Sequence, residues 1–245
     1  MSYPPSVAPL TDVERVLVVV AHPDDIDFGA AGTIARWTAE GLEVAYLLAT
    51  RGESGGFDET PRELMPAIRE AEQRAAAAAI GVKDVEFLDG YTDGALYVTH
   101  DLRRDISRAI RRFRPDRVLT QSPVRRWDRI GVGHPDHLAA GEATMSAVYP
   151  DARNPFAHPS LLADEGLEAW SVREVWLMGS PTADHAVDVT DTFGAKLDAL
   201  RAHVSQTAHM DDLEGMLRGF LRANAEAAGL PAGRLAESFT VLATA

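Results

Sequence analysis

Short apolar runs that alternate with helix-length segments are the feature that most limits the fold of this chain. Residues 15–21, RVLVVVA, form a nearly continuous β-branched run, which is typical of a strand buried on both faces of a parallel sheet. Further strands are expected at 42–50, 84–88 and 117–121, and helices at 27–40, 61–80, 101–113 and from Pro135 onward. This alternation predicts an α/β fold with a mostly parallel sheet covered by helices.

The C-terminal part of the sequence is less regular but shows no convincing linker. Proline-rich loops are expected at 122–133 and 150–168, strands at 173–178, 186–189 and 238–242, and helices at 193–205 and 211–227. The absence of repeats and of low-complexity segments predicts a single domain over 1–245. Its core and motifs would lie in 1–150, and 151–245 would complete the fold.

Composition excludes several kinds of partner and site. The formal charge of −13 argues against binding to nucleic acid or to an anionic membrane, because phosphate recognition needs a positive field. No apolar run reaches transmembrane length, and the N-terminus lacks the features of a secretory signal. We therefore expect a cytoplasmic protein without a membrane partner, and leave homo-oligomer formation open. No cysteine is present, so any metal would be bound by imidazole and carboxylate groups.

The first motif, HPDD at residues 22–25, directly follows the first predicted strand. Pro23 favours an extended conformation at His22, so the strand is expected to end there, at the edge of the sheet where α/β proteins bind ligands. Two adjacent carboxylates at such a buried position repel each other and lose solvation. They need a cation or several hydrogen-bond donors, and a divalent metal is the simplest candidate.

The second motif, HPDH at residues 134–137, follows the fourth predicted strand. Proline suits the first turn of a helix, so both histidines are expected on a similar face near the helix N-terminus. His22, Asp25 and His137 would then form a site of two histidines and one carboxylate with a position left for water. Ligand type favours zinc, with iron or manganese as alternatives. Either motif alone would also fit an ordinary helix start without a metal.

Both motifs closely resemble those of the zinc-dependent N-acetylglucosaminyl deacetylase family, also called the LmbE-like or PIG-L family. The family hallmarks AHPDD and HPDH stand unaltered. The resemblance covers most of the first 140 residues and includes 50–56, the helix at 69–80 and Asp93-Gly94. It implies a Rossmann-like three-layer sandwich with zinc bound by the residues that match His22, Asp25 and His137. It also implies that Asp24 is the general base, and that His134 stabilises the charged intermediate or protonates the departing amine.

Other residues are candidates for contact with the substrate or for support of the site. Arg69 matches an arginine that contacts substrate in family members acting on sugar–inositols, and Arg51 and Asp93 are further candidates for substrate binding. Asp136 follows closely after His134 and could hold its ring in the required tautomer. The remaining histidines share no such spacing and are assigned structural or surface positions: His100, His158, His185, His203 and His209.

Together these features predict a zinc-dependent hydrolase that deacylates an N-acyl amino sugar, such as an N-acetylglucosamine glycoside or a sugar–inositol. Val132 stands where some relatives have a tyrosine that would polarise the amide. An amidase acting on a thiol–sugar conjugate, or on an antibiotic-linked or lipid-linked sugar, is therefore an alternative, with specificity set by the loops at 122–133 and 150–168. A non-catalytic sugar- or nucleotide-binding domain is a distant alternative, because residues 22–25 replace the glycine-rich turn of dinucleotide-binding proteins.

Overall fold

The computed structural model describes residues 7–127, 129–130 and 133–244, which build a seven-stranded sheet. In chain order the strands are β1 Arg15–Val20, β2 Glu43–Leu48, β3 Asp84–Phe87, β4 Arg117–Gln121, β5 Glu174–Met178, β6 His185–Asp188 and β7 Ala236–Ala243. Their spatial order is β3-β2-β1-β4-β5-β7-β6. The strands from β3 to β5 are parallel, while β7 runs antiparallel to both β5 and β6. The predicted α/β fold with a mostly parallel sheet is confirmed.

β1 lies inside the sheet because its side chains are apolar on both faces. Val16, Val18 and Val20 join one buried cluster, and Leu17 and Val19 join a second cluster on the opposite face. The remaining members of both clusters come largely from the helices and from neighbouring strands. A strand that is buried on two faces needs a helical layer on each side, so the run at 15–21 dictates three layers.

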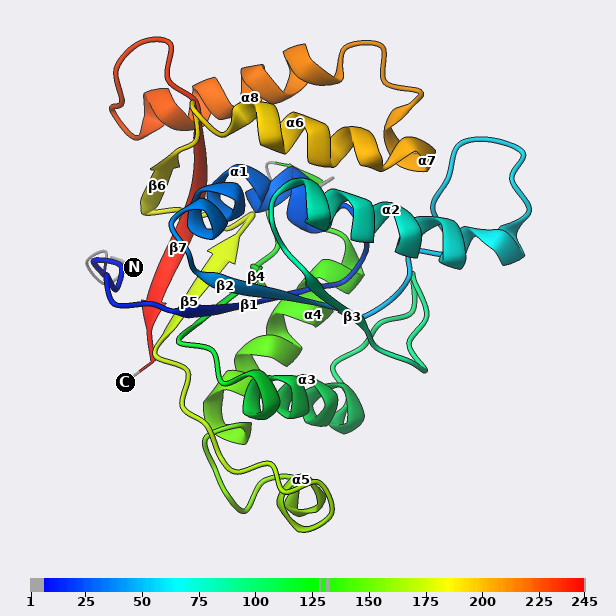
Figure 1. The fold of residues 1–245 in the computed structure, drawn as a ribbon, viewed down its shortest axis with the longest axis vertical. Helices are drawn as coiled ribbons and strands as arrows, with labels where there is room; N and C mark the ends of the chain where they lie inside the picture. The colour runs from blue at the N-terminus through cyan, green and yellow to red at the C-terminus, as the bar shows by residue number, and fades with distance from the viewer. Residues whose placement is uncertain (1–6, 128, 131–132, 245) are drawn as a thin grey trace.

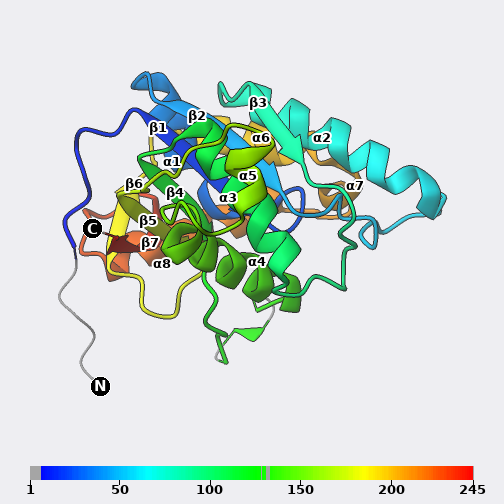
Figure 2. The same cartoon turned by 90° about the horizontal axis from the view of Figure 1, so that it is seen from below.

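The helices cover the two faces of the sheet in separate groups (Figure 1). One layer contains α1 Asp25–Ala39, the 3-10 helix η1 Arg62–Leu64, α2 Met65–Ala79, α6 Phe193–Ala202, α7 Val204–Thr207 and α8 Leu213–Ala227. The other contains α3 His100–Phe113, α4 Pro135–Ser146, its π-helical continuation η3 Ala147–Asp151 and α5 Pro159–Ala163. Figure 2, seen from below, shows α3, α4 and α5 lying over the sheet.

The order of the strands reverses between β1 and β4. After β1 the chain builds outward through β2 and β3, and β4 then returns to the other side of β1. Such a reversal is where open α/β sheets bind ligands, beyond the carboxyl ends of the strands. Residues 22–25 follow β1 and residues 134–137 follow β4 after a loop, so the topology brings both motifs to this position.

The C-terminal part differs from expectation in three places. The helix expected at 193–205 is divided into α6 and α7, because His203 has φ −84° and ψ 62° and leaves the helical region. The helix α5 occupies part of the loop expected at 150–168. The final strand was expected, but its insertion between β5 and β6 was not.

Val132, part of the predicted loop at 122–133, lies outside the described residues. Among the described residues, no helix is long and apolar enough to cross a bilayer.

Candidate active site

The two motifs meet at the carboxyl edge of β1 and β4. The imidazole rings of His22, His134 and His137 form a triangle whose centroids are 5.1, 5.2 and 5.3 Å apart. The carboxylate of Asp25 lies between two of these rings, with Oδ2 3.4 Å from His22 Nδ1 and Oδ1 2.9 Å from His137 Nε2. The three residues predicted to bind a metal are therefore in mutual contact through Asp25.

Two groups of side chains in the described part of the chain could hold a metal ion. One consists of His22, His134 and His137, and the other of His22 with Asp93 and Asp136. Both groups share His22, and Asp25 contacts two members of the first. Imidazole nitrogens and carboxylate oxygens are the donors that zinc, iron and manganese accept in proteins. The donor set thus fits a divalent metal, although the choice of ligands remains a prediction.

The charge around His22 also suits a cation. Its Nε2 lies 3.0 Å from Asp93 Oδ1 and 3.1 Å from Asp136 Oδ2, on the side of the ring away from Asp25. Burial by itself would lower the pKa of His22, but the surrounding carboxylates of Asp25, Asp136 and Asp93 raise it to about 12. Three acidic groups around one buried imidazole stabilise a positive charge at this point, whether a proton or a metal ion carries it.

The carboxylate of Asp136 supports His22 rather than the ring of His134. Besides contacting His22, it accepts hydrogen bonds from the backbone N–H groups of Gly94 (2.7 Å) and Leu96 (3.2 Å). His134 is the N-cap of α4, and its Nδ1 accepts the backbone N–H of Asp136 at 3.2 Å. The start of the helix, not the neighbouring carboxylate, therefore orients His134. Since Nδ1 is an acceptor, the neutral ring carries its proton on Nε2.

The side chain of Asp24 is mostly buried but remains partly accessible to solvent. Its side chain is 17% exposed, and its Oδ2 accepts a hydrogen bond from Arg69 Nη2 at 3.0 Å. Burial raises the pKa of Asp24 to about 6, while the positive charge of Arg69 works in the opposite direction. A carboxylate in this range can accept a proton near neutral pH and release it again.

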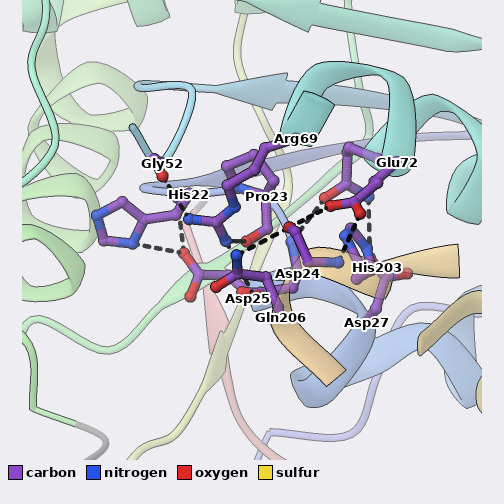
Figure 3. A network of polar contacts seen from close by, with 12 residues as sticks. His22, Pro23, Asp24, Asp25, Asp27, Gly52, Arg69, Glu72, His203 and Gln206 are labelled. Carbon is purple, nitrogen blue, oxygen red and sulfur yellow. Dashed lines mark hydrogen bonds and ion pairs between the residues drawn. The ribbon is translucent and has the colours of Figure 1, made fainter. Parts of the chain in front are cut away.

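Arg69 lies beneath Asp24 and is only 4% exposed. Its Nη2 also donates to the carbonyl of Pro23 at 2.6 Å, and its Nη1 donates to the carbonyl of Gly52 at 2.8 Å (Figure 3). These contacts place Arg69 as a support of the HPDD turn, whereas the sequence indicated a contact with the sugar. Substrate binding by Arg69 remains a prediction.

The other two candidates for substrate binding lie in different surroundings. Arg51 donates to Glu70, to the backbone carbonyl of Leu88 and to Asp89, and these hydrogen bonds join the loop after β2 to α2 and to the end of β3. Asp93 contacts His22 and accepts the backbone N–H of Ser54 at 3.0 Å. Asp93 is therefore part of the histidine cluster, and no contact joins Arg51 to that cluster among the described residues.

The glycine-rich loop at 50–56 makes room for Arg69. Gly52 has φ +64°, and a Cβ atom there would lie 2.0 Å from Arg69 Nη1; at Gly55 the corresponding distance is 2.6 Å. Both are far below van der Waals contact. The two glycines let the loop close over the guanidinium, which in turn reaches the HPDD turn.

Gly52→Ala is accordingly expected to reduce turnover about tenfold or more, because the added methyl group displaces the arginine that supports Asp24. The positive φ adds a cost of about 1–2 kcal/mol to folding. Gly41→Ala is the matched control, since Gly41 also has a positive φ (+92°) but no atom within 4 Å of an added Cβ. Thermal unfolding and turnover are measured for both variants. Equal turnover in the two variants would contradict the role assigned to the loop.

Three fully buried residues that the sequence did not single out for the site also lie close to Asp24. Gln73 accepts the backbone N–H of Asp24 at 2.9 Å and donates to Asp27 at 2.9 Å, and His203 contacts the same carboxylate oxygen of Asp27 at 2.8 Å. The sequence contains a signal for Gln73, because this residue follows Arg69 by four positions and therefore lies on the same face of the predicted helix. His203 carries no comparable local signal.

Comparison with known proteins gives a consistent set of relatives. A family profile described as GlcNAc-PI de-N-acetylase, PIG-L, matches residues 17–148. The diacetylchitobiose deacetylase of Thermococcus kodakarensis is 35% identical over 199 residues, covering 81% of this chain and 72% of that protein. The 1D-myo-inositol 2-acetamido-2-deoxy-alpha-D-glucopyranoside deacetylase of Rhodococcus erythropolis is 31% identical over 243 residues, covering 79% and 81%.

A solved structure extends the likeness to nearly the whole fold. The N,N'-diacetylchitobiose deacetylase from Pyrococcus horikoshii, in complex with its inhibitor MPG, superposes with a TM-score of 0.86 at 30% sequence identity. The match covers 95% of this chain and 85% of that one. The likeness therefore includes the C-terminal helices and strands, which lie outside the segment that the family profile matches.

Proposed function

The chain belongs to the PIG-L family of de-N-acetylases and is a hydrolase of the deacetylase class; on this basis we propose that it removes the acyl group from an N-acyl amino sugar with the aid of zinc. The observation that carries the proposal is the carboxylate of Asp25 between the rings of His22 and His137, next to Asp24. The substrate class is an N-acetylglucosamine glycoside or a sugar–inositol. The names of the two curated relatives support this class, because both describe deacetylases of acetamido sugars.

The metal site of the proposal consists of His22, Asp25 and His137. A zinc ion bound there supplies positive charge that polarises the amide carbonyl and acidifies a water molecule. The carboxylates of Asp93 and Asp136 behind His22 strengthen the ring as a donor, as acidic partners of metal-binding histidines do.

Asp24 and His134 perform the proton chemistry in this proposal. Asp24, with its pKa of about 6, accepts a proton as the oxygen of water bonds to the amide carbon. The neutral ring of His134 carries its proton on Nε2 and would donate it as a hydrogen bond to the oxygen on which negative charge develops. When the carbon–nitrogen bond breaks, the proton held by Asp24 passes to the departing amine. The products are a carboxylic acid and a free amino sugar.

The test is the release of acetate and of a free amine from two substrates, N,N'-diacetylchitobiose and N-acetylglucosaminyl-inositol. Turnover of at least one of them is expected. An N-acetyl-lysine peptide and an O-acetylated sugar serve as matched substrates from other classes, and neither should be hydrolysed at a comparable rate. A folded, zinc-loaded protein that released no amine from any N-acetyl amino sugar would overturn the proposal.

A further inference from the structure

One peptide group of the HPDD turn is held at both of its polar ends by α2. The carbonyl of Pro23 accepts from Arg69 Nη2 at 2.6 Å, and the N–H of Asp24, the other half of the same peptide group, donates to Gln73 Oε1 at 2.9 Å. Arg69 and Gln73 lie four residues apart and so occupy one face of the helix. The orientation of this peptide sets the direction in which Asp24 leaves the backbone.

The hydrogen bonds from Arg69 and to Gln73 hold a residue with a strained backbone. Asp24 has φ +78°, in the left-handed region that residues other than glycine rarely adopt. Such a conformation persists only where the surroundings enforce it, and it is common at sites where a side chain must point in one direction. Without the two hydrogen bonds to this peptide group, Asp24 would relax toward an ordinary backbone conformation and its carboxylate would change direction.

Gln73 can hold Asp24 only when its amide faces the right way. Its Nε2 donates to Asp27 Oδ2 at 2.9 Å, which leaves Oε1 as the atom that faces the Asp24 N–H. A flipped amide would place two donors against each other at Asp24 and two acceptors against each other at Asp27. Asp27 therefore determines the orientation of Gln73.

Asp27 is in turn fixed from the C-terminal part of the chain. His203 Nε2 lies 2.8 Å from the same Oδ2 atom (Figure 3). The side chains of Asp27, Gln73 and His203 are all fully buried. The segment that carries His203 is attached to α2, because Glu72 accepts the backbone N–H and the hydroxyl of Ser205 at 2.7 Å each. His203 has a non-helical backbone between α6 and α7, and its ring reaches Asp27 from this position.

We propose that Gln73, Asp27 and His203 are positioning residues for the reaction: they hold the peptide before Asp24 and so aim its carboxylate at the attacking water. This inference rests on the proposed function, in which Asp24 is the base. The three residues act through Asp24 and touch neither substrate nor metal. The contact of His203 with Asp27, in the first turn of α1, would place a determinant of activity outside the 17–148 segment that the family profile matches.

The experiment measures kcat, KM and zinc content for Gln73→Met, His203→Phe and His203→Gln. Gln73→Met keeps the length of the side chain and removes both hydrogen bonds, whereas His203→Phe removes only the bond to Asp27. Each is expected to lower kcat between about tenfold and 100-fold, because small displacements of a reacting group have effects of this size. KM and zinc content should remain within about twofold of the wild type. His203→Gln retains an N–H that can reach Asp27 and should recover most of kcat.

A second set of variants separates positioning from general damage. In an Asp24→Asn background, Gln73→Met and His203→Phe should lower kcat no further, since there is no base left to aim. Glu174→Gln is the control for stability, because Glu174 is buried at the amino-terminal end of β5, and its carboxylate accepts hydrogen bonds from Leu10, Arg117 and Trp176. It should lower the unfolding temperature and leave kcat of the folded enzyme unchanged.

The outcomes distinguish failure of this inference from failure of the proposed function. Wild-type kcat in Gln73→Met and in His203→Phe, together with a strong loss in Asp24→Asn, would overturn the positioning role alone. A further loss of kcat when either substitution is added to Asp24→Asn would overturn it as well. Full activity in Asp24→Asn would instead overturn the proposed base, and with it the reaction scheme.

Discussion

Removal of the metal with a chelator is expected to lower deacetylation by at least about 1,000-fold, and added zinc is expected to restore it. A metal that polarises a carbonyl contributes several kcal/mol to stabilisation of the transition state, which corresponds to a change of this size in rate. Within the proposed donor set of His22, Asp25 and His137, the acidic groups around His22 favour a positive charge. His134 offers little positive charge in place of the metal, because burial and the neighbouring imidazoles lower its pKa.

Metal content and acetate release are measured on the same samples before chelation, after chelation and after addition of zinc. Asp25→Asn provides the matched variant: its side chain has the same shape but no longer carries the charge that lies between the two histidines. It should bind zinc more weakly and need a higher zinc concentration for the same turnover. Metal-free protein that kept wild-type turnover would contradict the metal site.

Asp24→Asn is expected to lower kcat by about 10²- to 10⁴-fold, the contribution that a positioned general base makes. The amide has the size of the carboxylate and can still accept from Arg69, so the fold and the zinc content should be retained. KM should change little, because the proposal gives Asp24 a proton to accept and no part in holding the sugar. A variant that keeps one zinc per chain and full turnover would show that another group is the base.

The strands and helices near the motifs could be predicted because their signals are local. The β-branched run at 15–21 and the glycines and prolines that end the helices are read from neighbouring residues, and the observed elements follow them closely. The place of β7 could not be predicted in this way. Nothing in residues 236–243 states which strands they will pair with, and the order β5-β7-β6 depends on how the whole sheet is packed.

The same distinction applies to the site. The spacing within HPDD and HPDH predicted His22, Asp25 and His137 as site residues, and the fold places them together. The partners of the supporting groups could not be read from spacing. Asp136 follows His134 closely in sequence but its carboxylate reaches His22, 114 residues away, and His203 reaches a residue 176 positions away. Such contacts are decided by the docking of helices.

The inserted strand β7 also has a consequence for the order in which a new chain matures. Among the described strands, β6 pairs only with β7, so it cannot join the sheet before β7 has been made. Lys196 on α6 is fully buried and its ammonium pairs with Glu237 on β7, and burial of that charge without its partner is strongly unfavourable. Helix α6, and the histidine that follows it, can therefore settle only after β7 is in place. In the positioning role that we propose for His203, Asp24 would be aimed correctly only once β7 has paired, so a partly folded chain without β7 would be inactive.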